Sequence, residues 1–152
     1  MNGVELFLLG RTLMKIGEAA MPEPEGGSSQ YAGNTRAVLI VASDVAAHPD
    51  SAVGEIATRT GLPQSQVSTS VARLKEAGAV VTAPDPADRR RLLVRQAPRL
   101  SARVSEIRAT TIEDALTTAL DENTPEARKE VLAALEVLAR HLSPQTLARP
   151  RP

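Results

Sequence analysis

Cysteine is absent from this sequence of 152 residues and aromatic residues are scarce, with one Phe, one Tyr and no Trp. Without cysteine there can be no disulfide, no thiolate nucleophile, no thiol-based redox sensing and no cysteine-ligated zinc or iron–sulfur site. With so few aromatic side chains, a core has to be assembled from Leu, Val, Ile and Ala. This composition favours helices packed on helices.

A long uninterrupted hydrophobic run is also lacking. Residues 6–9 are apolar, but Glu5, Arg11 and Lys15 interrupt the N-terminal segment before a secretory core or a membrane span could form. We therefore expect a cytoplasmic protein that has no membrane partner.

Patterns typical of catalysis or metal binding are missing as well. The two histidines, His48 and His141, lie far apart in the sequence, and neither stands in a cluster of carboxylates. Asp44 precedes His48 by four residues, and we interpret this pair as a solvated helix end. No Gly-rich phosphate loop, nucleophile elbow or paired-carboxylate constellation occurs. The sequence thus predicts that the chain is not an enzyme and holds neither a metal nor a cofactor.

The charges are balanced in number but unevenly distributed. The 18 basic and 18 acidic residues give a net charge of zero. Residues 53–108 contain ten Lys or Arg and five Asp or Glu, which makes this region +5 and the rest of the chain −5. A chain divided in this way can present a cationic face to phosphate groups while its remainder stays acidic. The distribution indicates a nucleic-acid-binding region.

Apolar residues recur at three- and four-residue steps near the N-terminus, which predicts an amphipathic helix over residues 4–20. Residues 21–33 contain several Pro and Gly and are expected to form an irregular connector. A second helix, apolar on most sides, is expected to start at an N-cap on Asn34 or Thr35 and to end near Ala47. Such a helix belongs in the core.

Two further helices are expected in the C-terminal third of the chain. Ser101 can cap a long helix that reaches Leu120. Thr124 followed by Pro125 is a cap with proline at the first helical position, which opens a last helix with heptad-like apolar spacing. Residues 143–152 form a Pro-rich tail that we expect to fray.

Residues 51–53 are expected to form a minimal strand. From residue 53 to residue 78 the sequence has the pattern of two helices joined by a tight turn. Ala57 is small where the helices meet, Gly61 tolerates the positive φ of the turn, and Pro63 suits the first turn of the second helix. Apolar contacts between the two helices are expected from Ile56, Leu62, Val67, Val71 and Leu74. Short polar side chains that can reach base edges and phosphates are expected on the outward face of the second helix: Gln64, Ser65, Gln66, Ser68, Thr69 and Arg73.

A cationic hairpin follows directly. Two β-rich runs, 79–82 and 91–95, flank residues 84–90, in which Pro and Asp favour a turn. Arg89 and Arg90 stand at its tip. A guanidinium there fits the minor groove of DNA, where narrow width deepens the negative potential, and a nearby carboxylate can hold the side chain in position. The hairpin is therefore interpreted as the wing of a winged helix-turn-helix.

The chain resembles the MarR family of regulators at residues 57–61, 65–78 and especially at 85–90, which read Asp-Pro-Ala-Asp-Arg-Arg. The resemblance implies a winged helix-turn-helix between N- and C-terminal helices that intertwine into a dimer. It also implies that Arg90 enters the minor groove and that Asp88 orients it. Contacts of the recognition helix would come from Gln66, Ser68, Thr69 and Arg73. In this family a small molecule commonly acts as effector.

These observations predict a mainly α protein with a small β-wing, built as one structural domain with three regions. Residues 1–33 and 98–152 would supply the dimerisation helices, and residues 34–97 the winged helix-turn-helix. The apolar stripes of the outer helices could instead cover the core of a single monomer. We favour the dimer because paired half-sites raise the affinity and specificity of a helix-turn-helix protein.

The function predicted from the sequence is sequence-specific binding of a pseudo-palindromic DNA operator by a homodimer, which acts as a repressor released by a small molecule. The predicted DNA-binding residues are Gln64, Ser65, Gln66, Ser68, Thr69, Arg73, Asp88, Arg89 and Arg90. The alternative is a winged-helix module that docks an acidic protein partner through its basic wing.

Overall fold

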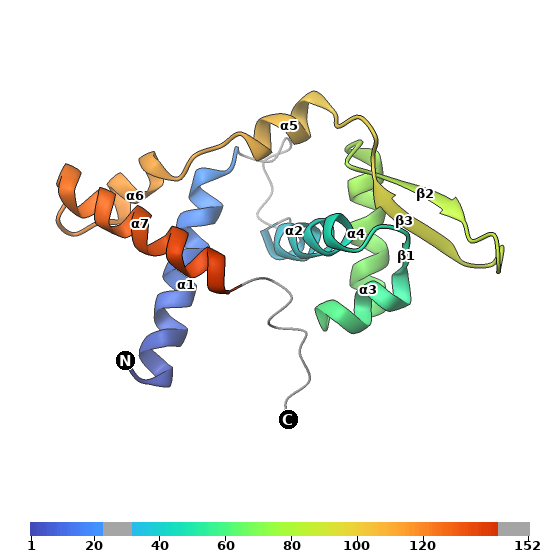
Figure 1. Cartoon of the computed structure of the whole chain (residues 1–152), viewed down its shortest axis with the longest axis horizontal. Coiled ribbons are helices and arrows are strands. Elements are labelled where there is room, and N and C mark those ends of the chain that lie inside the picture. Colours follow the sequence, from blue (N-terminus) through green and yellow to red (C-terminus); the bar gives the residue numbers. More distant parts are fainter. Residues whose placement is uncertain (23–31, 143–152) are drawn as a thin grey trace. The chain divides into compact units, whose positions relative to one another are not determined.

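The computed structural model describes residues 1–22 and 32–142, which contain seven helices and three strands (Figure 1). These residues fall into two compact units. We call residues 32–105 the winged unit and residues 1–22 with 106–142 the helical unit, and describe each by itself.

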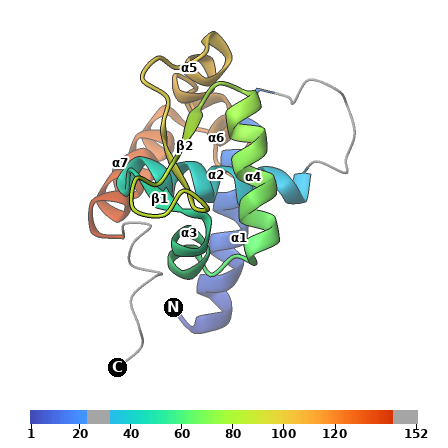
Figure 2. The same ribbon diagram turned by 90° about the vertical axis from the view of Figure 1, so that its right-hand side faces the viewer.

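The winged unit contains three helices and a small sheet. Its elements are α2 (Ala32–Ala47), β1 (Ser51–Ala52), α3 (Val53–Thr60), α4 (Gln64–Glu76), β2 (Val80–Pro84) and β3 (Leu92–Gln96). The strands are antiparallel in the order β1-β3-β2. Both β1 residues pair with β3, whereas β2 pairs with β3 along its whole length, from Val80 opposite Gln96 to Pro84 opposite Leu92. The hairpin of β2 and β3 projects beside α4 (Figures 1 and 2).

A single apolar cluster holds the winged unit together. Its buried members come from all three helices, from β2 and β3, and from Ala79 between α4 and β2: Val41, Val45, Ile56, Val67, Val71, Leu74, Ala79, Val80 and Val94. Four of these, Val41, Ile56, Val67 and Val94, are completely inaccessible. The predicted contacts between the two motif helices are confirmed, since Ile56, Val67, Val71 and Leu74 lie in this core and Leu62 packs against it.

Two glycines make the turns of the motif possible. Gly61 ends α3 at φ 72°, and its N–H donates to the carbonyl of Ala57 over 2.9 Å. Gly78 follows α4 at φ 77°. A Cβ at Gly78 would also stand 3.3 Å from the Cβ of Ser101, so this position has little room for a side chain. Because L-residues rarely adopt such φ values, glycine fits both turns without strain.

The helical unit is built from α1 (Gly3–Ala20), α6 (Glu113–Ala119) and α7 (Pro125–His141), while α5 (Ala102–Arg108) spans the boundary between the two units. Within this unit α6 packs against both α1 and α7. Asn2 caps α1 in a capping box with Glu5, and Thr124 caps α7 as predicted, by accepting a hydrogen bond from the N–H of Ala127.

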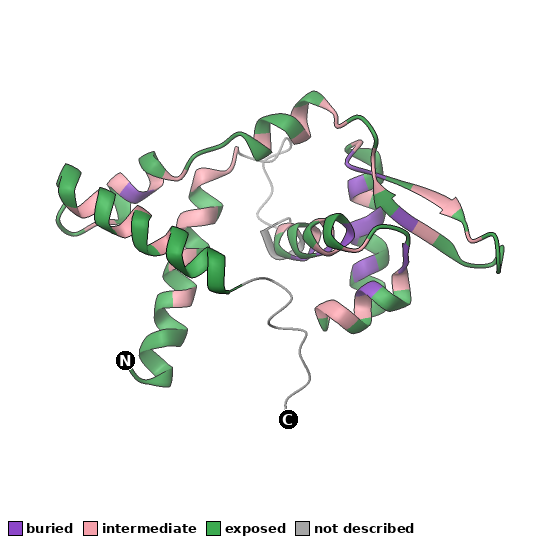
Figure 3. Cartoon of the chain, in the orientation of Figure 1, coloured by how far each residue is buried: buried purple, intermediate pink, exposed green. Residues whose placement is uncertain are grey.

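Apolar side chains of the helical unit are mostly on its surface. Leu116 on α6 is the one buried side chain among its described residues, and neither α1 nor α7 contributes any (Figure 3). Phe7 keeps 70% of its surface exposed, and Leu8 and Leu138 are exposed as well. The unit therefore lacks a core of its own comparable to that of the winged unit.

The predicted fold class is confirmed, but two helix boundaries are wrong. Helix α2 begins at Ala32, so Asn34 and Thr35 lie inside its first turn and are not its N-cap. The single long helix expected from Ser101 to Leu120 is two short helices, α5 and α6.

The break between α5 and α6 has a local cause. Thr110, Thr111 and Ile112 are three consecutive β-branched residues, which disfavour helix because of their restricted χ1 rotamers. The Thr110 hydroxyl also donates to the carbonyl of Ile107, which competes with helical hydrogen bonding. Ser101 does cap α5 as predicted, since its Oγ accepts a hydrogen bond from the N–H of Val104.

Most of the expected connector, and all of the expected tail, lie outside the described residues. Among the helices that the structure describes, none is long and apolar enough to cross a membrane.

Candidate nucleic-acid interface

Helix α4 presents a polar face to solvent and an apolar face to the core. Residues Val67, Ser70, Val71 and Leu74 are buried. The exposed positions include five of the six predicted contact residues of this helix: Gln64, Ser65, Gln66, Ser68 and Thr69. The sixth, Arg73, is half-buried and lies in the last turn. Side chains of this kind can donate to and accept from base edges in the major groove.

Aspartate side chains shape the tip of the wing. Asp85 Oδ1 accepts a hydrogen bond from the N–H of Ala87 over 2.9 Å, and Asp88 Oδ1 accepts one from the N–H of Arg90 over 3.0 Å. The carbonyl of Asp88 also accepts from the N–H of Arg91 over 2.9 Å. Asp88 thus contacts the backbone of Arg90, which fixes the direction in which that residue leaves the turn.

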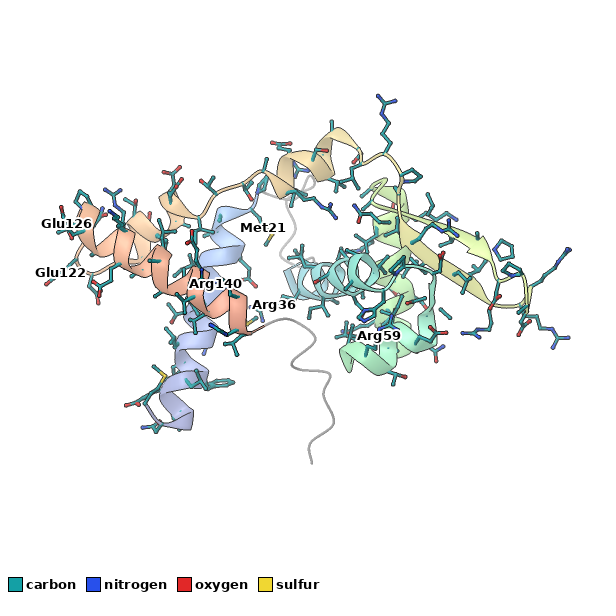
Figure 4. All side chains as sticks on the ribbon, in the orientation of Figure 1. Met21, Arg36, Arg59, Glu122, Glu126 and Arg140 are labelled. Carbon is teal, nitrogen blue, oxygen red and sulfur yellow. The ribbon has the colours of Figure 1, made fainter. Side chains whose placement is uncertain are left out.

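The three consecutive arginines of the wing differ in their surroundings. Arg89 and Arg90 are exposed, and neither guanidinium has an ion pair within the described part of the chain. Arg91 instead pairs with Glu55 of α3, and its Nη1 lies 3.9 Å from Oδ2 of Asp85. Nitrogen-tipped side chains extend from the far end of the hairpin (Figure 4). Two cations are therefore open to phosphate, and the third is already compensated.

Helix α4 and the wing border one shared groove. This open groove has a volume of about 560 Å³. It is lined by Gln64 and Ser68 of α4, by Arg90, Arg91 and Leu92 of the wing, by Ala52 of β1, and by residues 53–55 at the start of α3. The side chain of Gln64 lies close to Gly54: a Cβ added to Gly54 would stand 3.8 Å from Nε2 of Gln64. Recognition-helix and wing residues that are far apart in the sequence thus face the same space.

An ionic network that the sequence did not predict ties α2, α3 and β1 together. Arg59 forms a two-point contact with Asp44, with Nε 2.9 Å from Oδ1 and Nη2 2.7 Å from Oδ2. The same Nη2 donates to Ser51 Oγ, which donates to the carbonyl of His48. The hydrogen bond with Asp44 raises the pKa of Arg59, against the lowering effect of burial. Figure 4 labels Arg59 on α3.

Asp44 is therefore not the solvated helix end that its spacing with His48 suggested. Its side chain is 10% exposed and serves the packing of three elements. Partners fifteen residues apart in sequence carry no local signal, so this network could not be predicted. Among the described residues, no group of three or more His, Asp or Glu side chains is placed to hold a metal ion.

Together, the turn at Gly61, the exposed polar face of α4 and the arginine-tipped hairpin define a winged helix-turn-helix. Comparison with known families agrees with this class. Residues 33–91 match the model of the MarR family, which covers the helix-turn-helix and the wing up to Arg91. Over this region, which holds the helix-turn-helix and the wing, the chain is similar to the MarR family of winged-helix transcriptional regulators.

Similar solved structures cover nearly the whole chain, and the first two named here share its fold. RV1404 from Mycobacterium tuberculosis is 19% identical with a TM-score of 0.56, over 93% of this chain and 95% of that one. YusO from Bacillus subtilis is 21% identical with a TM-score of 0.54, over 93% and 100%. A MarR-like regulator from Thermotoga maritima is 26% identical with a TM-score of 0.49, over 94% and 98%. No curated protein sequence matches the chain.

The match over residues 33–91 agrees with two predictions at the level of class: a transcriptional regulator and DNA binding. Sequence reasoning missed Glu55 and Arg91 as contacting residues of the site. The run of three arginines gave a partial signal, because adjacent like charges require a reason, but the sequence did not indicate which one is paired within the fold.

Proposed function

We propose that this protein is a homodimeric regulator that binds a pseudo-palindromic DNA operator through α4 in the major groove and the wing in the adjacent minor groove. The observation that carries this proposal is the shared groove, in which Gln64 and Ser68 of α4 face Arg90 of the wing. One subunit would then read base edges and hold the sugar-phosphate backbone from a single surface.

The roles of the predicted residues follow from their surroundings. Gln64, Ser65, Gln66, Ser68 and Thr69 are exposed on α4 and are proposed to contact bases and flanking phosphates. Arg73, near the C-terminal end of α4, would contact the backbone. Arg89 and Arg90 would neutralise phosphates or enter the minor groove. Asp88 would act indirectly, by holding the backbone of Arg90 in the turn.

The exposed apolar side chains of the helical unit support the dimer. Phe7 and Leu8 on α1, and Val137 and Leu138 on α7, remain exposed in the isolated chain. Soluble monomers rarely leave this many large apolar side chains exposed on two helices of one unit. A second copy of the chain would cover them and would present two recognition helices to the two half-sites of an operator.

Repression with release by a small molecule is the mode of action that we propose from the family resemblance.

Arg90→Ala tests the interface, with Arg95→Ala as a matched control. Both substitutions remove one arginine from the wing, but Arg95 is paired with Asp50, 2.8 Å away, and does not line the groove. In titrations of duplex operator DNA we expect Arg90→Ala to weaken binding about tenfold and to reduce the dependence of log K on log salt by about 0.9, the value of one phosphate contact. We expect Arg95→Ala to change affinity by less than about threefold.

Equal effects of the two substitutions would mean that only net charge matters, and would contradict the proposed interface. The alternative of an acidic protein partner gains support if the wild-type chain is not retained on immobilised duplex DNA at moderate salt.

A further inference from the structure

Beyond the residues that face DNA, we propose that Glu55 and Arg91 form a strut between α3 and the wing that positions Arg90 over the groove. The inference rests on the proposed function, because it assigns a role to residues that support the same interface. Glu55 would be a positioning residue that contacts no DNA itself.

The part of the hairpin that carries Arg90 has little support from the sheet. Strand β1 pairs only with Leu93 and Val94 of β3, so the sheet has three strands at that level and two beyond it. The last pair of the ladder is Pro84 with Leu92, and Arg90 lies beyond it in the turn. Isolated two-stranded hairpins are marginally stable in water. A tether outside the ladder is therefore needed to fix the tip.

Arg91 supplies such a tether at the residue next to Arg90. Its Nη2 donates to Oε1 of Glu55, and its Nη1 lies 3.9 Å from Oδ2 of Asp85. Its backbone carbonyl accepts a hydrogen bond from the N–H of Asp85 over 2.9 Å. Arg91 thus connects both sides of the wing turn to α3.

The position of Glu55 makes the connection effective. Glu55 lies in the first turn of α3, where a carboxylate is favoured by the helix dipole. Helix α3 packs against α4 and follows β1 without a loop, so it belongs to the packed part of the winged unit. A contact from Glu55 to Arg91 therefore fixes the wing relative to the recognition helix.

The strut and simple electrostatics predict opposite changes in DNA affinity when the charge of Glu55 is removed. Glu55 lines the groove that we assign to DNA, so its negative charge repels phosphate. If Glu55 had no positioning role, Glu55→Gln would strengthen DNA binding. If the strut positions Arg90, the same substitution weakens binding despite the loss of a repulsive charge.

The experiment measures operator affinity for Glu55→Gln, with Asp50→Asn as the control. The Asp50–Arg95 pair joins the residue before β1 to β3 and is about as exposed as the Glu55–Arg91 pair, but it does not line the groove. We expect Glu55→Gln to weaken binding about two- to fivefold, the range open to an exposed ion pair. Asp50→Asn should leave affinity unchanged or slightly higher. The urea midpoint of unfolding should barely change for either variant.

A double substitution tests whether Glu55 acts through Arg90. Once Arg90 is removed, its position no longer matters, so Glu55→Gln combined with Arg90→Ala should bind no more weakly than Arg90→Ala alone. An additive loss would overturn the strut, as would unchanged or tighter binding by Glu55→Gln alone. If Arg90→Ala itself has no effect, the proposed function has failed, which is a different result from failure of the strut.

Discussion

The winged unit and the helical unit differ in how much of their apolar surface they bury. In the winged unit, eight buried side chains from five elements form one cluster together with Ala79, which lies between α4 and β2. In the helical unit, α1 and α7 are both longer than any helix of the winged unit, yet neither has a buried residue. The comparison teaches that well-capped helices can be specified locally, whereas a core requires partners from elsewhere in the chain or from a second chain.

The division matches the two tasks of the proposed regulator. Sequence-specific binding requires that α4 and the wing keep a fixed geometry, which a closed core provides. Dimerisation requires apolar surface that stays available until a second copy covers it. The winged unit, which has the core, would therefore bind DNA, and the helical unit, which lacks one, would bind the helical unit of a second copy of the chain.

The largest expected effect is the loss of a core side chain of the winged unit. Ile56 is completely buried in the cluster. We expect Ile56→Ala to lower the free energy of unfolding by about 3 kcal/mol, through lost transfer energy and the cavity that remains. Urea denaturation measures this change. Leu92, half-exposed in the same unit, serves as control, and Leu92→Ala should cost less than about 1 kcal/mol. Similar losses for both would show that the core does not dominate stability.

A smaller effect is expected from the network around Arg59. Asp44→Asn removes the charge that compensates a guanidinium only 25% exposed, and should lower the free energy of unfolding by about 2 kcal/mol. Asp50→Asn is the matched change at the exposed pair with Arg95 and should cost less than about 1 kcal/mol. Denaturation curves of the two variants, recorded at neutral pH, make the comparison. Equal costs would contradict the structural role of Asp44.

Substitutions of exposed apolar residues in the helical unit should change the dissociation constant of the dimer more than the free energy of unfolding. Phe7→Glu places a charge among exposed apolar side chains of α1, and we expect it to raise the dissociation constant of the dimer at least about tenfold, which is about 1.4 kcal/mol. Phe7→Leu keeps the position apolar and should change the constant far less. Sedimentation equilibrium over a range of concentrations measures both. A wild-type chain that stays monomeric over the whole concentration range would contradict the claim that the helical unit serves dimerisation.

Local signals in the sequence were sufficient for most of the winged unit. The spacing of Ile56, Val67 and Leu74, the glycine at the motif turn and the Pro-Asp turn of the wing each depend on neighbouring residues, and all three features are present in the structure. The Thr124 cap of α7 was predictable for the same reason.

The features that the sequence did not predict depend on distant partners or on weak propensities. Asp44 with Arg59, and Glu55 with Arg91, are pairs that only the fold brings together. The break between α5 and α6 depends on a short β-branched run whose effect on helix formation is small per residue. Apolar periodicity extended across it, so periodicity alone predicted one helix.

Selection of binding sites from a pool of random duplexes, followed by hydroxyl-radical footprinting, tests the central claim most directly. A dimer that uses α4 and the wing of each subunit should enrich an inverted repeat whose half-site centres lie about ten base pairs apart, and should protect the minor groove beside each half-site. Arg90→Ala should lose the minor-groove protection while keeping the same repeat. Enrichment of no sequence, or of a single site without a repeat, would contradict the account.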